Sequence, residues 1–151
     1  MSAVQYLASA GVKYQQFAAW PSGNILLTGA NQLIGTYSEL RRFQPANRDY
    51  LGWHAHHIVE SQDLERLGVA NRFPGRDQQL CVLLPERAHV GRVNSVLRSQ
   101  NPTSIQASAR DLKRAYADAY SIVGNYCGGG EAAIRQELVA LVNAIFRAAG
   151  L

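Results

Sequence analysis

The segment from Trp53 to Asn94 constrains the fold more than any other part of the chain. Within it, Leu80–Leu84 is a short unbroken apolar run, the pattern of a strand that is buried on both faces. A buried strand needs a neighbour, and the sequence WHAHHIV at residues 53–59 is the expected partner. Pro85 follows the run and suits the first position of a helix. The segment therefore predicts two paired strands, joined by a loop at Asn71–Arg76, and then a helix.

Three histidines of this segment are candidates for one shared site. His56 and His57 are neighbours on the first expected strand, where successive side chains point to opposite faces unless the strand is bent or bulged. We therefore expect them to do different jobs. His89 falls one turn inside the expected helix, which brings a third imidazole to the strand pair. His54 shares a strand face with His56, and we expect it at the rim of the site.

The arrangement resembles the HNH or His-Me finger nucleases, in which a two-stranded ribbon and a helix hold one divalent metal ion. More narrowly, Ala55-His56-His57 followed by Ile58-Val59 is similar to the AHH-type toxin nucleases at the C-terminal ends of bacterial polymorphic toxins. The resemblance implies that His56 is the metal ligand on the strand and His57 is the general base. It also implies that His89, in Leu84-Pro85-x-x-x-His89, is the metal ligand on the helix.

The rest of the expected site follows from the same resemblance. Gln78 or Gln79 would replace the middle asparagine of the family, which braces the loop carrying the base. Some members carry a second metal ligand on the helix, four residues after the first, and that position is Val93 here. Asn94, one residue further on, would complete or brace the metal shell instead. Two imidazoles and an oxygen ligand are compatible with one Mg, Mn, Ni or Zn ion. We also expect one of two arginines near His89 to clamp the scissile phosphate, namely Arg87 or Arg92.

Composition and charge are compatible with a nucleic-acid partner. The net charge is +4 with a pI near 9.3, and of the 15 basic residues only Lys13 and Lys113 are lysine. Guanidinium groups suit two-pronged contacts with phosphate, although a biased genomic composition gives the same count. Cys81 and Cys127 do not form a Cys-x-x-Cys pair, which disfavours a zinc ribbon. We find neither an export signal nor a membrane segment.

Patterns outside the central segment predict mostly helices. We expect one broken helix or two short ones over residues 2–20 and a capped helix from Thr36 to about Arg42. A short helix should follow from Ser61 to Leu67, with Ser61 as its N-cap. Thr103 to about Val123 and Glu131–Ala149 carry apolar stripes at helical spacing and should pack antiparallel, with Gly128–Gly130 as a helix breaker between them. The predicted fold is thus α+β, a helix-rich single domain over residues 1–151. Its ββα-metal core spans about 53–100, between flanks 1–52 and 103–150.

These observations predict a metal-dependent endonuclease that hydrolyses DNA with little sequence specificity; the preference for DNA over RNA rests on the resemblance. The resemblance further implies a monomeric C-terminal toxin domain, delivered by a secretion system within a larger exported protein and active in the target-cell cytoplasm. A cognate immunity protein, acidic to match this surface, would protect the producer. Two alternatives stay open: a non-catalytic module in which the metal only stabilises a nucleic-acid or protein binding surface, and a helical adaptor.

Overall fold

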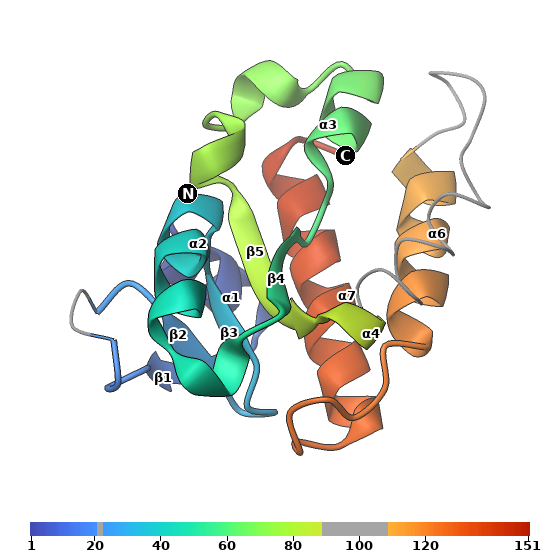
Figure 1. Cartoon of the computed structure of the whole chain (residues 1–151). Coiled ribbons are helices and arrows are strands. Elements are labelled where there is room, and N and C mark those ends of the chain that lie inside the picture. Colours follow the sequence, from blue (N-terminus) through green and yellow to red (C-terminus); the bar gives the residue numbers. More distant parts are fainter. Residues whose placement is uncertain (21–22, 89–108) are drawn as a thin grey trace.

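The computed structural model of the chain describes residues 1–20, 23–88 and 109–151. They form a single mixed α+β domain around one antiparallel sheet (Figure 1). The described helices are α1 (Ala3–Ala10), α2 (Tyr37–Ala46), α3 (Ser61–Arg66), α4 (Glu86–Ala88), α6 (Ala109–Ser121) and α7 (Glu131–Ala148). The strands are β1 (Tyr14–Gln16), β2 (Leu26–Thr28), β3 (Leu33–Thr36), β4 (Trp53–His57) and β5 (Leu80–Pro85), and short 3-10 turns lie at Arg48–Tyr50, Ala70–Arg72 and Arg76–Gln78.

The predicted strand pair is confirmed. The sheet has the order β1-β2-β3-β5-β4, and β4 pairs with β5 antiparallel in a register that runs from Trp53 opposite Pro85 to His57 opposite Cys81. Among the described strands β4 therefore forms one edge of the sheet. The helix expected after the pair begins at Glu86, one residue later than predicted, because Pro85 still belongs to β5. Its described part ends at Ala88, so the ββα arrangement as a whole stays a prediction.

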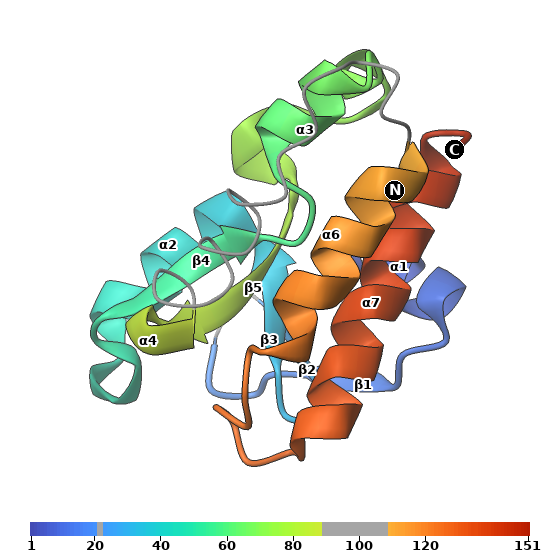
Figure 2. The same ribbon diagram turned by 90° about the vertical axis from the view of Figure 1, so that its right-hand side faces the viewer.

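The sheet separates two apolar clusters because β5 is buried on both faces, as its continuous apolar run predicts. Leu80, Val82 and Leu84 belong to the larger cluster, together with side chains of α1, α6 and α7. Cys81 and Leu83 belong to the smaller one, which α2 covers through Leu40 and Phe43. Figure 2 shows the sheet between α2 on one side and the antiparallel pair of α6 and α7 on the other. Successive residues of β4 consequently face two different environments.

The N-terminal prediction was partly wrong. The chain forms α1 only up to Ala10, where Gly11 adopts a left-handed conformation (φ 69°) and ends the helix. Residues 14–16, expected to be helical, form β1 and pair with β2. All three side chains of β1 are exposed, so its sequence carries no alternation of apolar and polar residues, and only pairing with β2 makes it a strand.

The other helix predictions agree with the structure where they can be compared, but the predicted cap of α3 is wrong. Its N-cap is Glu60, which makes no side-chain cap hydrogen bond, and Ser61 is the first residue of the helix. Thr36 caps α2 by accepting a hydrogen bond from the Glu39 backbone N–H, although the helix continues beyond Arg42 to Ala46. The stripe predicted over Glu131–Ala149 corresponds to α7, and α6 ends at Ser121, close to the predicted Val123. The predicted helix starts at Thr103 and around His89 lie outside the described residues. No helix within the described ranges combines the length and apolarity that crossing a bilayer requires.

Candidate functional site

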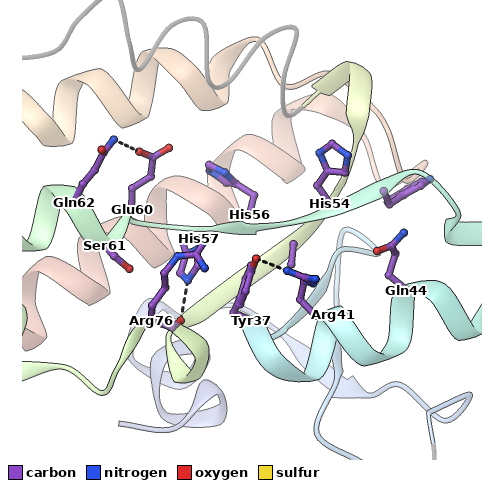
Figure 3. A pocket seen from close by; sticks show the side chains of 12 residues that line it. Tyr37, Arg41, Gln44, His54, His56, His57, Glu60, Ser61, Gln62 and Arg76 are labelled. Carbon is purple, nitrogen blue, oxygen red and sulfur yellow. Dashed lines mark hydrogen bonds between the residues drawn. The ribbon is translucent and has the colours of Figure 1, made fainter.

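An open cavity of about 600 Å³ lies along β4 and contains all three strand histidines (Figure 3). The cavity extends from α2 across the strand to the turn that leads into α3. Because β4 is an edge strand among those described, the cavity borders side chains from both faces of the sheet. Besides Trp53 and Ala55, it is lined by His54, His56, His57, Glu60, Ser61, Gln62, Tyr37, Arg41, Gln44 and Arg76.

His57 is held in one tautomer on the α2 side of the strand. Its Nε2 atom lies 2.9 Å from the backbone carbonyl oxygen of Arg76. A carbonyl oxygen can only accept, so Nε2 must carry the hydrogen, and in the neutral ring the lone pair sits on Nδ1. Burial lowers the pKa of His57 below its usual value, and the nearby charge of Arg76 adds to that shift. A neutral imidazole with a defined basic nitrogen is what a general base requires.

Tyr37, at the start of α2, supports the His57 ring. The two rings are stacked, with centroids 4.9 Å apart and planes 23° from parallel. The Arg76 guanidinium carbon lies 4.5 Å from the centre of the Tyr37 ring, a cation–π contact. Arg41, one turn further along α2, donates from Nη1 to the Tyr37 hydroxyl at 2.8 Å. These contacts place two guanidinium groups around Tyr37, in the cavity that His57 lines.

The two arginines give this side of the cavity a positive character. Both side chains are exposed, and neither forms an ion pair with a carboxylate of the described residues. Their charge also lowers the pKa of Tyr37, chiefly through the hydrogen bond from Arg41. Guanidinium groups that are not neutralised by the protein favour an anionic ligand, and phosphate is the group they bind best.

His56 lies on the opposite face of β4, against α6. Its Nε2 atom is 3.0 Å from the Tyr120 hydroxyl, and that hydroxyl donates its only hydrogen to the backbone carbonyl of Ile58 at 2.6 Å. The hydroxyl must therefore accept from His56, which places a hydrogen on Nε2 and the lone pair of the neutral ring on Nδ1. The His56 and Tyr120 side chains are 2% and 0% exposed, so this arrangement is shielded from water.

A second tyrosine of α6 holds the turn that follows β4. The Tyr116 hydroxyl donates to the Asp63 carboxylate at 2.5 Å and accepts from the Glu60 backbone N–H at 2.8 Å. Tyr116 and Tyr120 are one helical turn apart and both are fully buried. Together they fix the backbone from His56 to Asp63, which sets the position of the cavity's upper wall in Figure 3.

Gln79 braces the loop that carries the Arg76 carbonyl. Its side chain accepts from the Ser61 hydroxyl at 2.7 Å and donates to the backbone carbonyl of Pro74 at 3.1 Å. The loop from 74 to 79 is thereby tied to the start of α3. Of Gln78 and Gln79, it is Gln79 that makes these two contacts.

The structure brings some of the predicted site residues together and leaves others apart. His56 and His57 line one cavity from opposite faces of β4, and His54 lines it beside His56, as a rim position would. Arg87 is exposed in α4 and is not among the lining residues. The predicted ligands and phosphate clamp in the following segment, His89, Arg92 and Asn94, lie outside the described residues.

Five polar side chains of the site had not been predicted as such, namely Tyr37, Arg41, Glu60, Arg76 and Tyr120. The contacts of Tyr37 with His57 and of Tyr120 with His56 join residues that are far apart in the sequence. The position of Arg76 in the loop before β5 was the available signal. A histidine base on β4 needs a hydrogen-bond acceptor that fixes its tautomer, and a loop next to the strand can provide one.

The donors present are compatible with part of a metal site. In the described ranges, no three His, Cys, Asp or Glu side chains come together as a ligand set would. His56, whose basic nitrogen is Nδ1, and the Glu60 carboxylate nevertheless line the same cavity. An imidazole and a carboxylate are both accepted by Mn, Ni and Zn. The bond from His56 to Tyr120 is of the kind that orients a ligating histidine.

Comparison of this chain with models of known protein families, with curated proteins and with solved structures found no match.

Proposed function

We propose that this chain is a metal-dependent endonuclease that hydrolyses the phosphodiester bonds of DNA with little sequence specificity. The observation that supports it best is the geometry around His57. A buried, neutral imidazole keeps Nδ1 basic by donating from Nε2 to a backbone carbonyl, and it lines an open cavity together with two exposed guanidinium groups. Proton abstraction from water and binding of a phosphate are the two tasks that these groups suit.

The residues would divide the work as follows. His57 Nδ1 takes the proton from the attacking water, while Arg41 and Arg76 hold the oxygens of the scissile phosphate. Tyr37 keeps the His57 ring in place through stacking and presents Arg41 through its hydroxyl. A divalent ion, when bound, would stabilise the charge that develops on the phosphate and the leaving oxygen. His56 would hold it, with His89 and Asn94 as the ligands expected from the sequence.

The biological setting is proposed on the resemblance to AHH-type toxin nucleases. The domain would act in the cytoplasm of a target cell as the C-terminal part of a larger secreted effector. An unregulated nuclease kills its producer, so an immunity protein should be encoded next to it. The exposed positive groups at the cavity favour an acidic inhibitor. A housekeeping operon in place of an immunity gene would contradict this setting without affecting the nuclease activity itself.

Plasmid cleavage by purified protein with added Mg, Mn, Ni or Zn tests the activity. Replacement of His57 by alanine should lower the cleavage rate by about 100-fold or more, the effect of removing a positioned base. His54→Ala is the matched control, because it removes a histidine from the same cavity but from the rim of the other strand face. Equal losses in both variants would argue against His57 as the base.

Arg76→Gln separates phosphate binding from positioning of the base. The carbonyl that accepts from His57 belongs to the backbone and is retained in this variant. We expect weaker DNA binding while the His57 tautomer persists. Wild type that cleaves with none of the four metals, yet melts at a lower temperature when metal is chelated, would favour the non-catalytic binding module instead.

A further inference from the structure

A second cavity, of about 430 Å³, lies at the other end of β4. Its volume falls in the range of small-molecule sites. Leucines of three strands form its apolar part. Three aromatic rings, Tyr50, Trp53 and Tyr126, and three polar side chains, Asn31, Asp49 and Cys127, complete its lining.

Trp53 connects this cavity to the candidate active site, because it lines both. Trp53 and His57 are the first and last residues of β4. Four residues of extended chain span about 13 Å, so a ligand that follows the strand could occupy both places at once. An extended polymer has this shape, whereas a small substrate of the first cavity does not.

The chemistry of the second cavity suits a flat, partly polar group. Trp53 meets Tyr50 and Tyr126 edge to face, with centroids 5.0 and 6.0 Å apart. The Tyr126 hydroxyl donates to the buried side chain of Gln32, which fixes that ring. The amide of Asn31 and the carboxylate of Asp49 can hydrogen-bond to the edge of a base. Rigid aromatic walls with a few polar groups are how proteins bind unstacked nucleobases.

We propose that the cavity beside Trp53 receives an unpaired nucleobase of the substrate, so that the protein prefers single-stranded segments over duplex. This inference rests on the proposed nuclease function and adds the class of substrate to it. A base in a duplex must leave the stack and lose its partner before it can enter such a cavity, and this cost is absent in a single strand. A phosphate of the same strand can then reach Arg41 and Arg76, which line the neighbouring cavity.

Tryptophan fluorescence reports on occupancy of the cavity without any cleavage. Trp20 is the other tryptophan of the chain, so a Trp20→Phe protein leaves Trp53 as the reporter. In EDTA, an unstructured oligodeoxynucleotide should quench Trp53 and bind more tightly than a blunt duplex of equal length. Trp53→Leu should lower the single-strand affinity about 5- to 150-fold, the effect of losing one stacked base, and reduce the preference for single strands.

Alkylation of Cys127 gives a second readout in the unmodified protein. Cys127 is half-buried in the cavity wall, whereas Cys81 is fully buried and serves as an internal control. The oligonucleotide should slow alkylation of Cys127 and leave Cys81 unchanged. Protection with quenching supports the inference even if the protein cleaves no DNA, which would refute only the proposed function. Cleavage of DNA without quenching or protection, or equal affinity for single strand and duplex, would overturn the inference and leave the nuclease intact.

Discussion

Replacing Tyr120 by phenylalanine removes one hydroxyl that serves two buried groups of the site. In the native protein this hydroxyl donates to the Ile58 carbonyl and accepts from His56 Nε2. The ring itself is fully buried, so the substitution keeps the packing and deletes only the oxygen. We expect both a loss of stability and a loss of control over the tautomer of His56.

The expected size of the effect follows from these two contacts. A buried donor or acceptor that loses its partner costs about 1–3 kcal/mol, and here one of each is affected. The two losses together would lower the free energy of unfolding by about 2–6 kcal/mol, and reorientation of the His56 ring can recover part of it. Loss of this orienting bond should also weaken the binding of a divalent ion about 10-fold or more.

Urea denaturation and nitrogen NMR of the histidine rings provide the measurements. Tyr116→Phe is the matched control, because it removes a buried hydroxyl of the same helix whose two hydrogen bonds go to Asp63 and the Glu60 backbone instead of His56. Both variants should be destabilised, and only Tyr120→Phe should change the His56 ring signals. A stability loss below about 0.5 kcal/mol in Tyr120→Phe would show that the hydroxyl does not hold these groups, and the reasoning on the His56 tautomer would then fail.

Two further predictions concern the polar side chains of His57 and Glu137. Folding lowers the pKa of His57 below its usual 6.5, so the acidic limb of the kcat/KM profile should lie below pH 6.5. For the same reason the free energy of unfolding should fall, relative to that of His57→Gln, as the pH drops from 6.5 through the folded pKa. A midpoint above 6.5 would contradict the tautomer and burial of this ring. The Glu137 carboxylate in α7 accepts hydrogen bonds from Thr28, Gln32 and the Ala30 backbone. Glu137→Gln should therefore lower the free energy of unfolding by about 1–3 kcal/mol, as measured by urea denaturation. Glu131→Gln, at an exposed position of the same helix, should lower it less.

The sequence predicted the centre of the fold because its patterns there are dictated by burial. The apolar run at Leu80–Leu84 can only be satisfied by a strand covered on both faces, and the two clusters on either side of β5 are the result. The apolar stripe of α7 and the Thr36 cap of α2 could also be predicted, since each depends on residues close together in the sequence. The three exposed residues of β1 gave no such signal, because pairing with β2 alone defines that strand.

The candidate site was predictable in its histidines but not in their surroundings. The doubled histidine marks a strand whose neighbouring side chains must face two environments, and the structure places His56 and His57 in this way. Arg41 reaches the site because α2 packs beside β4, and Arg76 meets Tyr37 because the turn before β5 packs against α2. Helical spacing indicated which face of α6 is buried, but it could not show that two tyrosine hydroxyls on that face bind β4 and the following turn.

The opposite placement of the two histidines leads to a last prediction, on how their supports combine. Tyr37 holds His57 from the α2 side, and Tyr120 holds His56 from the α6 side, so within the described part of the chain the two tyrosines contact different histidines. Substitutions at sites without shared partners usually add within about 0.5 kcal/mol. We therefore expect Tyr37→Leu and Tyr120→Phe to have additive effects on the free energy of unfolding. A double-mutant cycle measures this directly. A coupling above about 1 kcal/mol would mean that β4 shifts as one unit when either support is lost, and the base and the ligand could then not be positioned independently.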